Sequence, residues 1–168
     1  MGISTESAQF TAEQAELWAT YSETLASLNL HLDRCLKEEV KLKLTDYRIL
    51  ESLVDSSQKL GLGADNPPLD PAVVRMRDLA QITAVSPSRL TYQVNNLCQQ
   101  GLVRKIPIPN DRRGKGVAIT NQGWKVYKKA QPVYLREVHH LALAHFKPET
   151  ERALYTFCLA VQSRLNAL

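Results

Sequence analysis

The stretch that decides the fold is Val73–Lys105, which reads VVRMRDLAQITAVSPSRLTYQVNNLCQQGLVRK. It starts with a short apolar face, made by Met76, Leu79, Ala80 and Ile82. Ala84 and Val85 then turn the chain. Ser86 offers a hydroxyl as N-cap, and Pro87 suits the first helical position because its fixed φ is already helical. The stretch therefore predicts two short helices joined by a tight turn.

The second of these helices has two chemically different sides. The apolar side consists of Leu90, Val94, Leu97 and Cys98. The opposite side carries small polar groups at spacings of three and four, namely Ser88, Thr91, Tyr92 and Asn95. Gly101 suits the end of the helix because glycine tolerates a left-handed conformation. This pair of helices predicts a helix-turn-helix, whose second helix fits the major groove of DNA.

A basic hairpin is predicted directly after the helix-turn-helix. Leu102–Ile106 and Val117–Thr120 have the composition of short strands, and the intervening Pro107–Gly116 reads as an extended tip. The tip carries Arg112, Arg113 and Lys115, which have the reach to enter a minor groove or hold the sugar-phosphate backbone. A helix-turn-helix followed by such a wing predicts a winged helix.

Charge also favours a polyanionic partner. The net charge of the chain is only +4, but residues 61–130 carry 11 Lys and Arg against 4 Asp and Glu, whereas residues 1–60 carry 6 against 10. A solvated basic face without a partner is the alternative. We expect double-stranded DNA to be contacted by the polar helix face and the wing, through Ser86, Ser88, Arg89, Thr91, Tyr92, Asn95, Arg112, Arg113 and Lys115.

The predicted fold class is mainly α, a winged helix-turn-helix with a two-stranded β wing and long N- and C-terminal dimerisation helices. Helical periodicity outside the helix-turn-helix and the wing occurs in four segments: about Ala12–Val40, Asp46–Ser56 with Thr45 as N-cap, a helix capped by Thr120 or Asn121 that kinks at Pro132, and a last helix opened by Pro148. Between the second of these segments and the helix-turn-helix, Gly61–Pro71 predicts a loop.

Three units follow from this pattern: residues 1–40 and 123–168 as dimerisation helices, and residues 41–122 as the DNA-binding domain. The outer helices carry more apolar surface than the winged helix can cover, which favours a homodimer on a pseudo-palindromic site. Packing of these helices within one chain is the alternative.

The sequence resembles the MarR family of bacterial winged-helix regulators. The resemblance lies in these residues: Leu44-Thr45 with Tyr47, Leu79-Ala80, Ser86-Pro87-Ser88, Leu97, Gly101-Leu102-Val103-Arg104, Asp111-Arg112-Arg113, and Ile119-Thr120 with Gly123. It implies a homodimer joined through its first and last two helices, with each recognition helix in a major groove and each wing in a minor groove. It also implies a repressor that a small ligand or oxidation releases. The chain departs from the family in a longer, proline-rich Lys59–Val73 loop and in Asn110, where the family often has an aspartate.

The effector of such a regulator would be a small molecule, such as a phenolic compound, in the family's cleft. Candidate lining residues are Trp18, Tyr21, His31, Tyr47 and Arg48, although an aromatic on an apolar stripe, such as Tyr21, is usually a core residue. His139, His140 and His145 could in principle bind metal, but adjacent histidines point in different directions on a helix, and we expect no metal there.

Cysteine oxidation is the alternative switch. Cys35, Cys98 and Cys158 all fall on apolar sides of predicted helices, where a thiol usually behaves as a small, unreactive hydrophobe. Cys35 lies near the end of the first helix, whereas the peroxide-sensing branch of the family carries its reactive cysteine near the start. Cys98 ends the recognition helix, and its oxidation would disturb the packing that orients that helix.

Several function classes are disfavoured. The chain has no glycine-rich phosphate loop, no His-Glu-x-x-His, no Cys-x-x-Cys and no nucleophile elbow, so we expect no enzyme, no catalytic residues and no cofactor. It has no apolar run long enough to cross a membrane and no secretory signal, which predicts a cytoplasmic protein without a membrane partner. The resemblance implies a bacterial protein that is associated with the nucleoid when bound to DNA. An RNA- or protein-binding winged helix is the remaining alternative.

Overall fold

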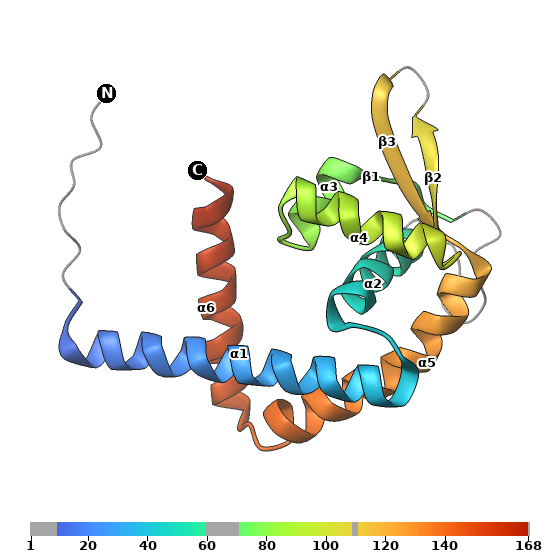
Figure 1. The fold of residues 1–168 in the computed structure, drawn as a ribbon. Helices are drawn as coiled ribbons and strands as arrows, with labels where there is room; N and C mark the ends of the chain where they lie inside the picture. The colour runs from blue at the N-terminus through green and yellow to red at the C-terminus, as the bar shows by residue number, and fades with distance from the viewer. Residues whose placement is uncertain (1–9, 60–70, 109–110, 168) are drawn as a thin grey trace, which may run out of the picture.

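The computed structural model describes residues 10–59, 71–108 and 111–167, without the side chains of residues 59 and 111–114. It is mainly helical, with one small sheet (Figure 1). The elements in chain order are α1 (Ala12–Val40), α2 (Leu44–Lys59), β1 (Val74–Arg75), α3 (Met76–Ile82), α4 (Pro87–Gln99), β2 (Val103–Ile108), β3 (Asp111–Ile119), α5 (Asn121–Val138), the π-helical turn η1 (His139–Leu143) and α6 (Pro148–Asn166). The predicted fold class, a mainly α winged helix-turn-helix with a β wing and long terminal helices, is confirmed.

Helix α1 has the predicted bounds, and both of its ends have a local cause. At the start, Thr11 accepts a hydrogen bond from the N–H of Gln14 while the Gln14 side chain accepts one from the N–H of Thr11, which is a capping box. At the end, Lys41 takes a left-handed conformation with φ 59°, which stops the helix. The 29-residue helix therefore needs no tertiary contact to define its length.

Helix α2 begins earlier than its sequence predicts. Thr45 lies inside the helix and is not its N-cap, so that prediction is wrong. The first N–H, that of Leu44, is instead satisfied by the Asp33 carboxylate of α1 at 3.0 Å. Lys37 pairs with the same carboxylate at 2.5 Å and, with this backbone hydrogen bond, lowers the pKa of Asp33. A side chain from another helix therefore replaces the local cap.

The helix-turn-helix forms where predicted, in α3 and α4, with one correction to its chemistry. Ser86 has the extended backbone of an N-cap, and Pro87 occupies the first turn, but the Ser86 hydroxyl makes no capping hydrogen bond within the described chain. The turn between the helices includes Ala84 at φ 51°, a conformation that costs a residue with a side chain roughly 1–3 kcal/mol. The hydroxyl of Ser86 is thus exposed at the start of α4.

The end of α4 is a Schellman motif around Gly101, as the glycine predicts. Gly101 has φ +71° and donates to the Cys98 carbonyl at 3.0 Å, and Leu102 donates to the Leu97 carbonyl at 2.9 Å. The motif turns the chain directly from α4 into β2, which fixes the position of the wing relative to α4.

The sheet has three antiparallel strands in the order β1-β3-β2. β1 was not predicted, because two residues are too short to show a strand period; it pairs Val74 with Val117 of β3. Strands β2 and β3 are longer than predicted, and the extended tip Pro107–Gly116 is wrong, since Pro107 pairs with Lys115. Pro107 is tolerated because β2 is an edge strand, and the register shifts at Pro107/Ile108. The Asp-Arg-Arg run consequently belongs to a strand.

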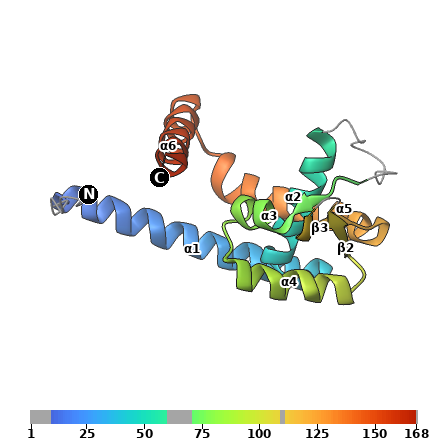
Figure 2. The same ribbon diagram turned by 90° about the horizontal axis from the view of Figure 1, so that it is seen from above.

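Helix α5 follows β3 through the predicted Thr120 cap, whose hydroxyl accepts from the Gly123 N–H at 3.0 Å. The helix continues past Pro132 to Val138 and leads through η1 to α6. α6 stands apart from the winged helix and beside the N-terminal half of α1 in both views (Figures 1 and 2). None of its side chains is buried.

The hydrophobic core lies between the C-terminal half of α1, the winged helix and α5. Its fully buried large side chains include Leu32, Leu36, Tyr47, Ile49, Leu50, Leu53, Leu79, Leu90, Leu97 and Ile119. The core therefore supports α4 from its apolar side and leaves the N-terminal half of α1 and all of α6 outside it.

In the described parts of the chain, no helix is both long and apolar enough to span a membrane.

Candidate nucleic-acid interface

The outward face of α4 is exposed and polar, while its inward face is closed by the core. Leu90, Val94 and Leu97 are fully buried. The predicted contact residues on the other side are all exposed: Ser86, Ser88, Arg89, Thr91, Tyr92 and Asn95. Tyr92 is 67% exposed, which is unusual for an aromatic side chain on a helix that packs so tightly on its other face. The helix thus presents six polar groups to solvent on a rigid support.

Two of these polar groups are already engaged in hydrogen bonds. The Thr91 hydroxyl donates to the Pro87 carbonyl at 2.8 Å, one turn back along α4. The side-chain oxygen Oδ1 of Asn95 accepts a hydrogen bond from the Lys105 ammonium of β2. The second bond ties the polar face of α4 to the wing, so that helix and strand are held as one surface.

A polar basin lies beside α4, toward the junction of α1 and α2. It has a volume of about 290 Å3, and its lining residues are Lys41, Lys43, Thr45, Asp46, Arg89, Tyr92, Gln93, Asn96 and Gln100. The Gln93 amide oxygen is buried and finds no hydrogen-bond partner among the described residues. Burial raises the pKa of Asp46, against the opposing effect of Lys43. Three cationic side chains at the rim make the basin suited to a phosphate oxygen.

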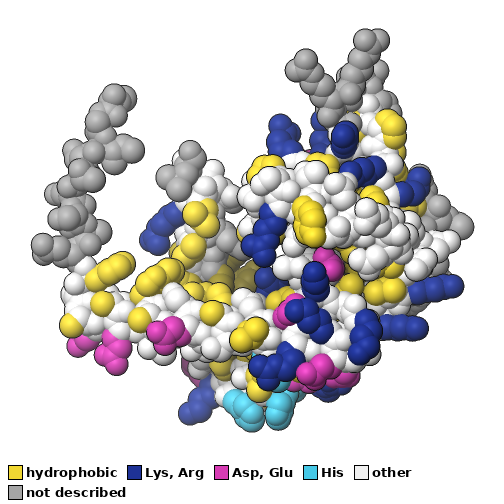
Figure 3. Space-filling model, in the orientation of Figure 1, with side chains coloured by type: hydrophobic (Ala, Val, Ile, Leu, Met, Phe, Trp, Pro, Cys, Tyr) yellow, Lys and Arg dark blue, Asp and Glu magenta, His cyan; other side chains and the backbone are white. Residues whose placement is uncertain are grey.

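Basic side chains also continue from α4 onto the wing. Lys115 is exposed on β3, as are Arg104 and Lys105 on β2, which the sequence analysis did not select. The side chains of Arg112 and Arg113 lie outside the described part of the chain. Dark blue cationic side chains gather over the winged-helix side of the molecule (Figure 3). Their positive charge could have identified Arg104 and Lys105, because both lie in the predicted strand Leu102–Ile106 next to the recognition helix.

The residues predicted to line an effector cleft do not form one site. Tyr47 is fully buried and stacks on Tyr134 and Tyr127, with ring centroids 4.6 and 5.8 Å apart. Its hydroxyl donates to Glu51 at 2.8 Å. Burial is the main cause that raises the pKa of Tyr47, and it raises the pKa of Tyr127 to about 12. This aromatic stack is part of the core between α2 and α5.

Of the other four candidates, Trp18, Tyr21 and His31 lie on α1, and Arg48 lies on α2, where it interacts with Tyr134 of the stack. Trp18 and Tyr21 line an open apolar hollow of about 400 Å3 with Phe10, Gln14, Leu17, Leu154 and Phe157. Arg48 donates to the Asn29 side chain at 2.7 Å. His31 contacts Glu137 of α5 at 2.8 Å. The yellow apolar surface along α1 and α6 in Figure 3 contains the hollow.

The three cysteines are unpaired and half-buried. Burial is the first cause that raises the pKa of Cys35, followed by the negative charge of Glu137. The thiol is therefore protonated at neutral pH, which slows oxidation. Cys158 lines an open apolar hollow of about 500 Å3 on α6. Cys98 packs against the core at the end of α4.

Comparison with known proteins agrees with this arrangement. The model of the MarR family matches residues 61–114. No curated protein sequence matches the chain. Among solved structures, the chain is similar to Sco3205, a MarR family transcriptional regulator from Streptomyces coelicolor solved in complex with DNA, with 27% identity, 94% of each chain covered and a TM-score of 0.80.

Two further structures share the fold. AbsC, a MarR family transcriptional regulator from Streptomyces coelicolor, is 25% identical, with 96% of this chain and 100% of that chain covered and a TM-score of 0.80. The transcriptional regulator BldR from Sulfolobus solfataricus is 23% identical, with 92% and 99% covered and a TM-score of 0.73. The helix-turn-helix, the wing and the outer helices are thus matched along nearly the whole chain. Residues 61–114 therefore match the model of the MarR family, and nearly the whole chain is similar in fold to MarR family transcriptional regulators.

Proposed function

We propose that the protein is a repressor of the bacterial cytoplasm, which binds a pseudo-palindromic DNA operator as a homodimer and is released by a small ligand. The proposal that the protein binds DNA depends on the exposed polar face of α4, which is linked to the cationic wing by the Asn95–Lys105 hydrogen bond. A helix with a polar outer face and an adjacent basic wing fits a major groove and the phosphates beside it. The similar Sco3205 was solved with DNA, which supports the same partner class here.

The residues divide into two roles. Arg89 and Tyr92, both exposed on α4, and Asn95, once it leaves Lys105, have the donors and acceptors that distinguish base pairs in the major groove. Lys41 and Lys43 at the basin, with Arg104 and Lys115 on the wing, would neutralise phosphates without sequence preference. A base edge or the DNA backbone would be contacted by Ser86 at the N-cap of α4 and by Ser88 and Thr91 on its first turns. Arg112 and Arg113 would extend the wing into the minor groove.

Fragments selected from genomic DNA by the purified protein test this proposal. Fluorescence anisotropy then compares the selected duplex, a shuffled duplex, duplex RNA and single strands. We expect the selected duplex to bind ~1000-fold more tightly than the shuffled one, in the range typical of specific regulators. Equal affinity for duplex RNA, or no preference among duplexes, would contradict a DNA regulator and favour an RNA- or protein-binding module.

Self-association is supported by the apolar surface that one chain leaves uncovered. On α1, Leu17 is 70% and Trp18 55% exposed, and on α6 Phe157 is 43% and Leu165 62% exposed. Tyr21 contacts the Phe157 ring edge-on at 5.8 Å, which links these patches into one surface. Exposed apolar surface of this extent marks an interface, and a second copy covers α1 and α6 symmetrically.

Sedimentation equilibrium tests the dimer with a matched pair of variants. Phe157→Asp places a charge in the centre of the uncovered surface and should yield a monomer, whereas Ile82→Asp changes a side chain of similar exposure on α3 and should leave the dimer intact. A wild-type monomer at micromolar concentration, or a dimeric Phe157→Asp protein, would contradict this interface.

Release by a ligand is supported by the position of α1, whose N-terminal half lines the apolar hollow and whose C-terminal half packs in the core that supports α4. Trp18 and Tyr21 line the apolar hollow, and the exposed Arg48 could pair with an aromatic carboxylate, whereas Tyr47 is buried in the core. Loss of operator binding on addition of phenolic acids, tested in the same anisotropy assay, would identify the ligand class.

Release by peroxide in the wild-type protein, lost when a cysteine is changed to serine, would point to the redox-sensing alternative. A promoter fusion whose expression rises when the gene is deleted would distinguish a repressor from an activator.

A further inference from the structure

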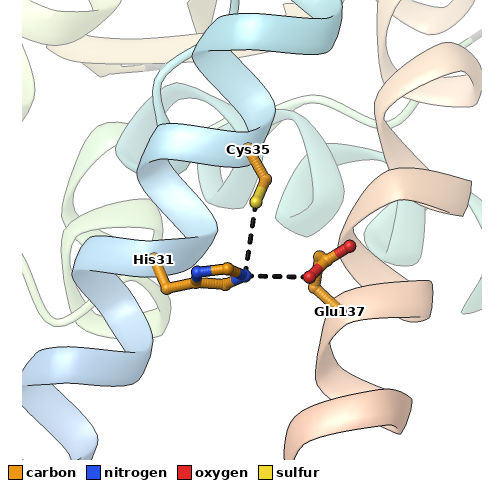
Figure 4. A group of neighbouring side chains, drawn as sticks. All are labelled: His31, Cys35 and Glu137. Carbon is orange, nitrogen blue, oxygen red and sulfur yellow. Dashed lines mark hydrogen bonds and ion pairs between the residues drawn. The ribbon is translucent and has the colours of Figure 1, made fainter.

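Three side chains of types that commonly bind metal ions, those of His31, Cys35 and Glu137, converge between α1 and α5 (Figure 4). Nε2 of His31 lies 2.8 Å from Oε2 of Glu137 and 3.3 Å from Sγ of Cys35. The three ligand atoms all lie within 4.8 Å of one another, and the three side chains are half-buried. No other group of this kind is found among the described residues.

The fold places these groups together for simple reasons. His31 and Cys35 are four residues apart on α1, so they lie on the same face one turn apart. Glu137 is near the end of α5, which packs along α1, and faces them from the opposite side. The other oxygen of Glu137 accepts from Nε of Arg136 at 2.9 Å, and Arg136 also pairs with Glu39 of α1. This outer set of contacts orients the carboxylate, as second-shell partners do at metal sites.

No single protonation state of Nε2 of His31 allows a hydrogen bond both to Glu137 and from the Cys35 thiol. Nε2 of His31 has one in-plane position, which holds either a proton or a lone pair. If it carries the proton, it can donate to Glu137 at 2.8 Å, and Cys35 then has no acceptor there. If it carries the lone pair, it accepts from the Cys35 thiol but faces a carboxylate oxygen at 2.8 Å. A cation shared by all three atoms removes this conflict.

We propose that His31, Cys35 and Glu137 bind a divalent transition-metal ion of the Zn²⁺ class, which ties α1 to α5. One nitrogen, one sulfur and one oxygen form a ligand set typical of Zn²⁺, with water as the fourth ligand. Tetrahedral Zn²⁺ holds a nitrogen and a sulfur ligand about 3.6 Å apart and a nitrogen and an oxygen about 3.3 Å apart, from the usual bond lengths. The observed distances of 3.3 and 2.8 Å require the side chains to separate by only a few tenths of an ångström. The thiol proton and any proton on Nε2 leave to solvent as the ion binds.

This site differs from the histidines that the sequence first suggests. His139 and His140 are exposed on η1, and His145 is exposed after it. Those three belong to no group of converging ligands in the described chain. They therefore serve as matched controls for His31.

The test is a titration of the chelator-treated full-length protein with Co²⁺, followed by absorbance. We expect one Co²⁺ per chain and a thiolate-to-cobalt charge-transfer band in the near ultraviolet. Cys35→Ser should abolish the band, and His31→Gln and Glu137→Gln should each weaken binding by ~100-fold or more, whereas Cys158→Ser and His140→Gln should behave as wild type.

Thermal unfolding gives a second readout that does not depend on colour. Zn²⁺ should raise the unfolding temperature of the wild-type protein and of Cys158→Ser, and not that of Cys35→Ser, since only a folded site binds the ion. Absence of a charge-transfer band in the wild-type protein, or a band that survives Cys35→Ser, would overturn the proposal. Neither measurement contains DNA, so its failure is distinct from a failure of the proposed operator binding.

Discussion

Replacing Gly123 with alanine should destabilise the protein, although alanine is normally the better helix former. Gly123 lies in the first turn of α5, and a Cβ there would be 2.0 Å from the Leu102 carbonyl oxygen and 3.0 Å from Cγ1 of Ile119. Ordinary contact begins at 3.4 Å, so α5 and the start of β2 must separate by about 1.4 Å. The atom met is backbone, which cannot rotate away as a side chain could.

The magnitude follows from the contacts at this junction. The Thr120 hydroxyl accepts from the Gly123 N–H at 3.0 Å, and the Thr120 N–H donates to the Leu102 carbonyl at 3.1 Å. Losing the cap costs about 1 kcal/mol, losing the hydrogen bond about 1 kcal/mol and overpacking about 1–3 kcal/mol. The higher helix propensity of alanine returns about 1 kcal/mol. The net loss is about 2–4 kcal/mol.

Thermal and urea unfolding at a fixed chain concentration measure this loss, because stability of an assembling protein depends on concentration. For a chain of this length we expect the unfolding temperature to fall by roughly 10 °C. Lys125→Ala, an exposed substitution two residues further along α5, should leave it nearly unchanged. A Gly123→Ala protein as stable as wild type would refute the reasoning, since it would mean that the junction yields without loss.

The remaining predictions concern the DNA surface and one buried carboxyl. Arg89→Ala should reduce binding to the selected operator by about 1–3 kcal/mol and relax the sequence preference of the protein. Arg112→Ala should instead weaken binding to all duplexes alike and lower the slope of log affinity against log salt concentration by about one. Anisotropy at several salt concentrations separates the two effects, and equal losses on selected and shuffled DNA for both variants would contradict this division. Lys105→Ala removes the hydrogen-bond partner of the Asn95 side chain. In hydrogen-exchange experiments, the backbone amides of the wing should then exchange faster than in the wild-type protein, while those in the buried part of α4 stay protected. Unchanged protection of the wing would show that this hydrogen bond does not hold it. Burial raises the pKa of Glu51, so ionisation of this carboxyl opposes folding. The resulting loss in the free energy of unfolding grows as the pH rises from the pKa of the unfolded chain, near 4.5, toward the higher pKa of the folded protein. Glu51→Gln keeps the acceptor for Tyr47 and should be more stable than wild type at pH 7 but not at pH 3, as urea unfolding at both values would report; a difference independent of pH would point to packing instead.

The parts of the fold that the sequence predicts best have local causes. Gly101 ends α4 in the expected left-handed conformation, and Thr120 caps α5 through a residue three positions on. Both signals are complete within a few residues. The same holds for the polar face of α4, whose exposed residues follow from helical spacing alone.

The parts it misses depend on contacts between distant segments. The start of α2 is set by Asp33 of α1, so Thr45 gave a false N-cap signal. The two residues of β1 become a strand only because β3 is beside them. His31 and Cys35 could be paired from their spacing, but Glu137 is 106 residues from His31 and joins them only through the packing of α5 on α1. A metal-ligand group of this kind has no sequence signature.

Helix α5 joins two regions that have separate tasks. It starts immediately after β3, at the root of the wing, and ends beside α1 at Glu137. Its 18 residues give a length of about 27 Å, and a helix resists changes in length far more than changes in tilt. A tilt of about 5° about one end of such a helix would displace the other end by about 2 Å, which is comparable to the shifts seen in allosteric helices. The distance between the wings of a two-fold assembly would therefore be set by the angle at which this one helix leaves α1.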